Sequence, residues 1–257
     1  MRKPSRTPRD PLKVLVIDVG GTNVKVLGTG QSEPRKIPSG PAMTASKMVA
    51  AVKRAVAGWA YDVVSIGYPG PVWDGRPAAE PKNLGGGWVT CDFQRAFGKP
   101  VRIINDAAMQ ALGSYEGGRM LFLGLGTGLG SALMIDGVLA PMELAHLPYS
   151  KGRTYEHYVG LQGLKRWGKK RWRRHVADVT QALRRALQVE YVVLGGGNAK
   201  KLKDLPEWAR LGDNGNAFLG GFRLWEERQP RVVQNSGEQR RNKIRSQGSI
   251  TPSRRLE

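Results

Sequence analysis

The stretch Val14-Leu-Val-Ile-Asp-Val-Gly-Gly-Thr-Asn-Val-Lys-Val-Leu27 decides the fold of this chain. Val14 to Ile17 is an apolar run that predicts a buried strand, and Val24 to Leu27 is rich enough in β-branched residues to pair with it. Gly20-Gly21-Thr22-Asn23 has the composition of a hairpin turn, because glycine accepts a positive φ and asparagine tolerates one. The sequence therefore predicts a strand, a glycine turn and a second strand.

Polar groups around this turn suggest that it holds phosphate. Asp18 ends the first strand, Lys25 lies in the second, and Gly20, Gly21 and Thr22 carry free N–H groups between them. Backbone donors approach a phosphate only where side chains are small, and a carboxylate holds Mg²⁺, often through water. We therefore expect phosphate at the turn and Mg²⁺ on Asp18. An ordinary hairpin closed by an Asx turn is the open alternative.

Composition indicates a soluble protein. Of the 257 residues 40 % are apolar, no run of 18 apolar residues occurs, and no basic-then-apolar segment opens the sequence. This length is enough for one large or two modest domains. Cys91 is the single cysteine, which excludes an internal disulfide and a cysteine-rich zinc site, so we expect a cytoplasmic protein.

The formal net charge of +20 is unevenly distributed. Residues 165 to 185 hold nine Lys or Arg against one Asp, and residues 223 to 257 hold nine against four acids. Such charge favours a polyanionic partner, either nucleic acid, a membrane surface or polyphosphate. The alternative is a basic surface that serves solubility, followed by a disordered tail.

Hydrophobic periodicity predicts alternating strands and helices. Helices are expected at 44–60, 92–97, 107–113, 165–188 and 220–225, and strands at 61–68, 101–104, 120–123, 132–135 and 191–194. The strand–glycine turn–strand pattern recurs about a hundred residues after the first, which suggests a duplicated α/β unit. Residues 1–11 and 228–257 are charged and without periodicity, and we expect disordered basic arms there.

Two further glycine-rich turns follow predicted strands. Gly126-Thr127-Gly128 offers N–H groups and a hydroxyl for a second phosphate contact, and Gly195-Gly196-Gly197 allows close approach of a nucleoside or another phosphate. Neither turn is a Walker loop, and the spacing does not match the Rossmann fingerprint. Three such turns favour one phosphate-bearing ligand held between two domains.

Asp106 lies at the end of a predicted strand and is a candidate catalytic base. Phosphoryl transfer to a hydroxyl needs a carboxylate that accepts the proton near the metal. The alternative is that Asp106 is the N-cap of the helix that follows.

A loop-rich segment further along supplies acids and a histidine. Glu143, His146 and Glu156 could hold several hydroxyls of a sugar, with surface polar residues as the alternative. His157 and His175 show no partner pattern, and we expect both at the surface.

Residues 165 to 174 combine seven cations with two tryptophans. Such a segment binds nucleic acid by stacking and phosphate contact, or forms a track for inorganic polyphosphate, or is a solvated helix face. Trp167 and Trp172 do not share a helix face closely, so one of them is expected to pack inward. The candidate track residues are Lys165, Arg166, Lys169, Lys170, Arg171, Arg173 and Arg174.

Taken as a set, the motifs resemble the ROK sugar kinases of the actin-like ATPase superfamily. They are Asp18-Val-Gly-Gly-Thr-Asn-Val-Lys25, Gly67-Tyr-Pro-Gly-Pro71, Asn105-Asp106-Ala-Ala and Gly126-Thr-Gly-Leu-Gly130. Asn83-Leu-Gly-Gly-Gly-Trp88, Glu143-Leu-Ala-His146 and residues 211–225 are most similar to the polyphosphate glucokinase branch. The resemblance implies an α/β fold of two ribonuclease-H-like domains, 12–105 and 106–226, around a central cleft.

The resemblance also implies roles for individual residues. Asp106 would be the general base for the 6-hydroxyl of glucose or a related hexose, and Asp18 would hold Mg²⁺ through water. The sugar would be held by Asn83, Asn105, Glu143, His146 and Glu156. Phosphates would be held by Asp18, Gly20, Gly21, Thr22, Lys25, Gly126, Thr127 and Gly128, with Gly195, Gly196 and Gly197 beside the nucleoside of ATP.

Two departures from the family pattern bear on this implication. The cysteine-rich zinc motif of many members is absent, so His146 is not expected to bind zinc. Ala145 replaces the usual glycine before His146, which would strain the loop if that position needs a positive φ. A non-catalytic protein that binds sugar or polyanion, and a nucleic-acid binder acting through 165–185, are the other functions considered. We expect no membrane partner, and a homodimer is one option for the oligomeric state.

Overall fold

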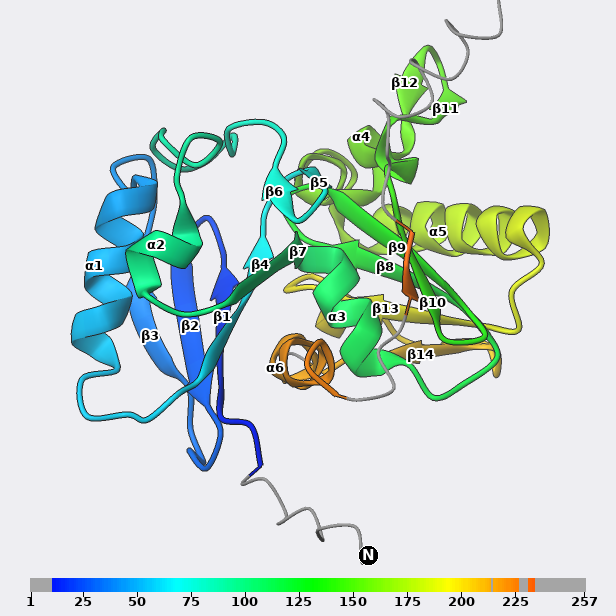
Figure 1. The fold of residues 1–257 in the computed structure, drawn as a ribbon. Coiled ribbons are helices and arrows are strands. Elements are labelled where there is room, and N and C mark those ends of the chain that lie inside the picture. Colours follow the sequence, from blue (N-terminus) through cyan, green and yellow to red (C-terminus); the bar gives the residue numbers. More distant parts are fainter. Residues whose placement is uncertain (1–10, 214, 227–230, 234–257) are drawn as a thin grey trace, which may run out of the picture.

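The computed structural model describes residues 11–213, 215–226 and 231–233, and it contains two large β-sheets (Figure 1). The first has the strand order β3-β2-β1-β4-β7 and the second β14-β13-β8-β9-β10-β15. The first sheet comprises β1 (Val14–Val19), β2 (Asn23–Gly28), β3 (Arg35–Pro38), β4 (Val63–Tyr68) and β7 (Val101–Asn105). The second comprises β8 (Arg119–Leu125), β9 (Leu129–Ile135), β10 (Val138–Met142), β13 (Tyr191–Gly195), β14 (Ala209–Leu211) and β15 (Arg231–Val232).

Helices and two small hairpins complete the described part of the chain. The hairpins are β5 (Val72–Trp73) with β6 (Arg76–Pro77), and β11 (Pro148–Ser150) with β12 (Arg153–Thr154). The helices are α1 (Ala45–Ala55), α2 (Phe93–Phe97), α3 (Asp106–Ser114), α4 (Tyr155–Val159), α5 (Leu161–Leu187) and α6 (Asn216–Arg223), with short 3₁₀ turns η1 (Leu144–His146) and η2 (Ala199–Lys201). Among the described residues, no helix is both long enough and apolar enough to span a membrane.

The predicted hairpin forms the centre of the first sheet. β1 pairs antiparallel with β2, which places Asp18 opposite Lys25, and it pairs parallel with β4, which places Asp18 opposite Gly67. The apolar residues of β1 are buried on both faces, because Leu15 and Ile17 pack in the core that includes α1 and Val16 packs in the core that includes α3 and α6. The hairpin therefore fixes a carboxylate at the carboxyl end of a central strand.

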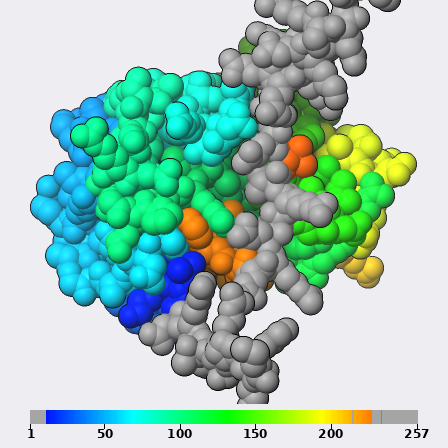
Figure 2. Space-filling model, viewed as in Figure 1, coloured from blue at the N-terminus to red at the C-terminus, as the bar shows by residue number. Residues whose placement is uncertain are grey.

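Helices α3 and α6 lie between the two sheets, and the orange atoms of α6 are visible there in the space-filling view (Figures 1 and 2). The two helices cross closely: a Cβ on Gly113 would lie 1.8 Å from the carbonyl oxygen of Asn216. α6 also packs on β1 and β4, where the Ser65 hydroxyl donates a 2.6 Å hydrogen bond to the carbonyl of Gly221. A helix late in the sequence thus contacts the first sheet, while the predicted division into 12–105 and 106–226 stays a prediction.

Most predicted elements form, with shifted ends. The first predicted helix begins after Thr44, whose hydroxyl accepts from the amide of Lys47, and it ends at Ala55. The prediction of one basic helix over 165–188 is wrong in two respects. The helix starts at Leu161, and Gly168 interrupts it with φ 69° and ψ 166°. A further difference is at 231–232, which pair with β10 although a disordered arm was expected from 228 onward.

The other residues of the expected arms, 1–10, 228–230 and 234–257, lie outside the described residues.

Candidate functional site

Two carboxylates and a lysine meet at the ends of the central strands. The Lys25 ammonium lies 3.3 Å from the Asp18 carboxylate. A Cβ on Gly67, the register neighbour of Asp18, would be 3.7 Å from the Cα of Asp106. On the other side, a Cβ on Gly130 of β9 would be 2.8 Å from the Ala107 side chain. Asp106 therefore lies at the junction of the two sheets, close to Asp18.

Burial changes the proton affinity of both acids. The pKa of Asp18 is raised by desolvation, and Lys25 acts in the opposite direction. Desolvation, with the Asp18 charge adding to it, raises the pKa of Asp106 to about 7. The charge of Glu143 contributes in the same direction, which places that side chain within electrostatic range of Asp106. A carboxylate with this pKa gains and loses its proton near neutral pH.

The N-cap of α3 is Asn105, not Asp106. The side-chain Oδ1 of Asn105 accepts hydrogen bonds from the backbone amides of Ala107 and Ala108, at 3.0 and 3.1 Å, and its Nδ2 donates to the Gly70 carbonyl. Asp106 is the first residue of the helix, where its carboxylate accepts a hydrogen bond from the amide of Ala107. The capping alternative for Asp106 is therefore wrong, and Asn105 has a structural task besides any contact with sugar.

The first glycine turn is shaped by protein contacts. A Cβ on Gly20 would lie 2.8 Å from the carbonyl oxygen of Asn23, and one on Gly21 would lie 3.3 Å from the Asn83 side chain. The amide of Gly20 donates to that same Asn23 carbonyl, and the hydroxyl of Ser39 donates to the Gly20 carbonyl. The turn therefore stands beside Asn83, one of the predicted sugar residues.

The second and third glycine turns lie side by side. The Asn198 amide nitrogen donates to the Gly126 carbonyl at 3.0 Å, and its backbone N–H donates to Leu125 at 2.9 Å. Gly196 has φ +82°, and a Cβ there would collide with the backbone of Leu125. The structure thus joins the two predicted phosphate turns into one surface.

Two glycines of this surface have no packing reason to be glycine. A Cβ on Gly126 or Gly197 would meet no heavy atom within 4 Å, and neither residue has a left-handed φ. By contrast, Gly128 packs against the Glu156 carboxylate. Glycine at open positions is explained when a ligand needs to approach the backbone closely.

The other predicted sugar residues are dispersed around these turns. Glu156 is half-buried, and its carboxylate accepts a 3.4 Å hydrogen bond from the amide of Leu129. Glu143 is the N-cap of the short η1 turn and His146 is its last residue, and both side chains are exposed. Ala145 is buried and is not among the described residues with positive φ, so the replacement of glycine does not strain this turn.

The basic helix exposes most of the predicted track. Trp172 is fully buried and donates from its indole nitrogen to the Val159 carbonyl, which confirms that one tryptophan packs inward. The guanidinium groups of Arg166 and Arg171 lie over the Trp167 ring. Exposed track residues are Lys165, Arg166, Lys169, Lys170, Arg171 and Arg174, and Arg173 is half-buried.

The prediction of a surface position is confirmed for His157 and is wrong for His175. His157 is exposed and completes a capping box with Thr154. His175 is half-buried, and its Nδ1 lies 3.2 Å from the Tyr149 hydroxyl, with Tyr158 and Trp167 packed around it. Burial lowers the pKa of His175. The four aromatic rings come from α4, α5 and the β11–β12 hairpin, so no local sequence pattern announces this cluster.

A chain of hydrogen bonds from Asn198 through Lys201 to Arg173 was not predicted from the sequence. The Lys201 ammonium donates to the side-chain Oδ1 of Asn198 at 2.8 Å. The Nε of Arg173 donates to the backbone carbonyl of Lys201 at 2.6 Å. An asparagine directly after three glycines was the one local signal, because such a residue at a turn often hydrogen-bonds neighbouring backbone.

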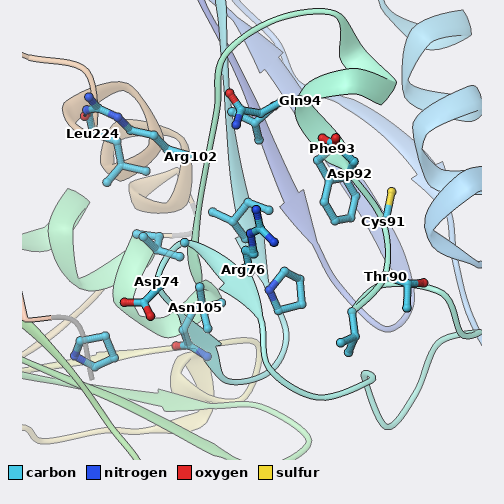
Figure 3. A pocket seen from close by; sticks show the side chains of 18 of the residues that line it. Asp74, Arg76, Thr90, Cys91, Asp92, Phe93, Gln94, Arg102, Asn105 and Leu224 are labelled. Carbon is cyan, nitrogen blue, oxygen red and sulfur yellow. The ribbon is translucent and has the colours of Figure 1, made fainter. Parts of the chain in front are cut away.

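A cavity of about 700 Å³ lies beside the edge strand β7 (Figure 3). Asp74 and Arg76 of the β5–β6 hairpin, Phe93 of α2 and Arg102 of β7 contribute to its walls. Of the predicted site residues, Asn105 alone lines it within the described chain. The chemistry suggested by the paired acids therefore belongs to the strand ends and turns and not to this cavity.

The described ranges hold no dense cluster of metal-binding side chains. No group of three or more His, Cys, Asp and Glu side chains there could hold a metal ion. A Mg²⁺ ion bound by one or two carboxylates together with substrate phosphates needs no such group.

Comparisons with known proteins agree with this geometry. Residues 14–141 match the model of the ROK family. Polyphosphate glucokinase of Mycobacterium tuberculosis is 29 % identical over 224 residues, covering 77 % of this chain and 81 % of the relative. Polyphosphate glucokinase of Mycobacterium leprae is 28 % identical over 212 residues, covering 72 % of this chain and 63 % of that protein.

Solved structures share the fold. The inorganic polyphosphate/ATP-glucomannokinase of Arthrobacter sp. strain KM has a TM-score of 0.70 and 24 % identity, covering 82 % of this chain and 97 % of that one. The ROK family glucokinase of Streptomyces griseus, in complex with glucose and AMPPNP, has a TM-score of 0.61 and 18 % identity over 82 % and 98 % of the two chains. The expected α/β fold of the actin-like ATPases is thereby confirmed, and residues 14–141, just under half of the chain, are similar to the ROK family.

Proposed function

We propose that this protein is a sugar kinase that transfers a phosphoryl group from inorganic polyphosphate, ATP or both to the 6-hydroxyl of glucose or a related hexose. The observation that carries the proposal is the position of Asp106, half-buried at the junction of the sheets beside Asp18. The curated relatives are polyphosphate glucokinases, which supports the same substrate classes.

Asp106 is the proposed general base. A base works best when its pKa lies near the operating pH, and burial raises the pKa of Asp106 to about 7. Its carboxylate would accept the proton of the sugar hydroxyl as the oxygen attacks the terminal phosphorus. Catalysis would otherwise consist of positioning and of neutralising phosphate charge, since phosphoryl transfer asks little covalent chemistry of the protein.

Asp18 is the proposed Mg²⁺ ligand, and the residues present fit such an ion. The carboxylates of Asp18 and Asp106 lie close together, because the negative charge of Asp18 contributes to the raised pKa of Asp106. Lys25 offsets part of that charge at 3.3 Å, and carboxylate oxygens are the ligands that Mg²⁺ prefers. When bound, the ion would neutralise the donor phosphates.

The phosphoryl donor and the sugar would occupy different parts of the site and meet near Asp106. The donor phosphates would lie against the Gly20 turn and the joined turns at Gly126 and Gly197, whose open backbone supports close approach. The sugar would lie near Asn83 and Glu143, with His146 and Glu156 from the second half of the chain. Asn105 would act mainly by holding the start of α3, and with it Asp106, in place.

A coupled assay for hexose 6-phosphate tests the proposal. Glucose and mannose are each offered with Mg²⁺ and either ATP or long-chain polyphosphate, and a chelator serves as the metal control. Product formation with at least one donor, lost on chelation, is the expected result. Absence of product with every sugar and donor, in a preparation that is folded by circular dichroism, would exclude the proposal.

The basic helix is proposed to guide polyphosphate. Replacing Lys169, Lys170, Arg171, Arg173 and Arg174 with Gln is expected to raise the KM for polyphosphate more than the KM for ATP. A control of equal charge replaces Lys36, Lys53, Arg54, Arg95 and Lys99 with Gln in the first half of the chain. Equal kinetics of the two variants with polyphosphate would remove the helix from the donor site.

A further inference from the structure

The loop Gly197–Lys203, which follows β13, carries three lysines next to the open glycines. Lys200 and Lys203 are exposed and Lys201 is half-buried. None of the three forms an ion pair within the part of the chain that the structure describes. The loop therefore carries three positive charges that form no ion pair in the described residues, next to Gly197, although Asp204 and Glu207 follow in the sequence.

Asn198 holds this loop in a fixed position. It is only 8 % exposed, and its side chain uses both ends: the nitrogen donates to the Gly126 carbonyl, and the oxygen accepts from the Lys201 ammonium at 2.8 Å. Buried polar groups that satisfy one another give a single well-defined geometry. Lys201 is therefore oriented by the same residue that joins the two glycine turns.

Arg173 connects the loop to the basic helix. Its Nε donates a 2.6 Å hydrogen bond to the Lys201 carbonyl. A continuous set of contacts thus runs from the open turn at Gly126, through Asn198 and Lys201, to the middle of α5. Lys201 of the loop and Arg173 of the helix therefore lie side by side, although they are 28 residues apart in sequence.

The same loop offers little to a nucleoside. A nucleoside is held by apolar or stacking contacts, whereas Ala199 and Leu202 are buried and turned into the core of the second half. The side chains left at the surface of the loop are lysines. A chain of phosphates carries a negative charge at every unit and gains from each cation along its path.

We infer that Lys200, Lys201 and Lys203, held by Asn198 and Arg173, bind the outer part of an inorganic polyphosphate chain and favour this donor over a nucleoside triphosphate. The inference rests on the proposed function for the identity of the reaction. It goes beyond that function because it assigns donor preference to three lysines that no motif marks.

Direct binding tests the inference without turnover. The triple variant Lys200→Gln, Lys201→Gln, Lys203→Gln is compared with parent protein for binding of long-chain inorganic polyphosphate, by equilibrium dialysis across a salt series and without sugar. The Kd is expected to rise about tenfold at low salt, and the dependence of log Kd on log salt becomes less steep. The matched control Lys36→Gln, Lys53→Gln, Arg54→Gln, which changes the same number of charges, is expected to bind as the parent does.

Kinetics then separate donor preference from the reaction itself. If the protein is a kinase, the triple variant raises the KM for polyphosphate about tenfold and changes the KM for ATP less than twofold. Equal effects on both donors, or a parent protein that does not bind polyphosphate, would overturn the inference. Absence of sugar phosphorylation with intact, lysine-dependent polyphosphate binding would instead remove the proposed function and leave the assigned binding loop standing.

Discussion

The glycine turn of the first sheet and the joined turns of the other sheet are similar in sequence but have glycine for different reasons. At Gly20 and Gly21, a side chain would press on the Asn23 carbonyl and on Asn83. At Gly126 and Gly197, a side chain would meet nothing within 4 Å. The first turn is glycine because the protein occupies the space, whereas Gly126 and Gly197 occupy positions that the protein leaves open.

Charge divides in the same way between the two regions. The strand ends of the first sheet supply Asp18 and Lys25, and Asp106 follows directly on its edge strand. The turns of the second sheet supply open backbone, with lysines on the loop behind them. If the proposed function is right, both regions contact the donor phosphates, but the first also supplies the acids for the chemistry and the second supplies the open backbone. Substitutions in the two regions should therefore fail in different ways.

Loss of the acid at the junction should have the largest effect. Asp106→Asn keeps the size of the side chain and removes the proton acceptor, so kcat for sugar phosphorylation is expected to fall by about 10³-fold. The Kd for polyphosphate, measured without sugar, should change little. Turnover within tenfold of the parent would show that another group takes the proton and would end the division of labour described above.

Asp18→Asn should produce the next largest effect, a loss of about a hundredfold in kcat/KM together with a weaker dependence on Mg²⁺. It should also alter the pH profile. If Asp106 is the base, the rate of the parent is expected to rise with pH around 7, where Asp106 loses its proton. Because the Asp18 charge helps to raise the pKa of Asp106, its removal should move this limb to lower pH. A limb that stays in place, measured at saturating Mg²⁺, would mean that the two acids do not interact.

Alanine at the glycines tests the comparison of the turns itself. Gly126→Ala and Gly197→Ala should leave the free energy of unfolding within about 0.5 kcal/mol of the parent, yet raise the donor KM about tenfold. Gly20→Ala should destabilise the fold by about 1–3 kcal/mol, because its Cβ would lie 2.8 Å from a carbonyl oxygen. Urea unfolding and donor kinetics of the three variants give both quantities. Similar free energies of unfolding for all three variants would contradict the distinction between the packed Gly20 and the open Gly126 and Gly197.

The fold was predictable from the sequence because its signals are local. The apolar run of β1 and the glycine turn that follows it predicted the hairpin, and the motif at Asn105-Asp106 marked a strand end followed by a helix. The break at Gly168 was missed although glycine is a poor helix former, since the surrounding pattern is helical on both sides. The two-residue strand at 231–232 is too short for any periodicity to show.

Within the candidate site, residue types were predictable but their partners were not. The choice between Asn105 and Asp106 as helix cap depended on backbone geometry one residue apart, and both residue types are good caps. The link from Asn198 to Arg173 and the ring cluster at His175 join elements distant in sequence. Such contacts arise only when the sheets and α5 pack together, so no single segment encodes them.

The smallest predicted effect concerns the stability of the fold, and it follows from the burial of the Asp106 carboxylate. Folded protein keeps a proton on Asp106 up to about pH 7, whereas an ordinary aspartate loses it near 3.8. Between these values the folded state binds more protons than the unfolded state, so the stability that this group contributes falls as pH rises from 3.8 to about 7 and stays low above that. Because Asp106→Asn cannot ionise, the variant should melt a few degrees higher than the parent at pH 8 and should differ little from it only at about pH 4 and below. Asp74→Asn, on the exposed β5–β6 hairpin, is the control and should melt as the parent does at both pH values. A variant that is inactive and also less stable than the parent at pH 8 would mean that the carboxylate is held by favourable contacts, and that its proton affinity is not set by burial beside Asp18.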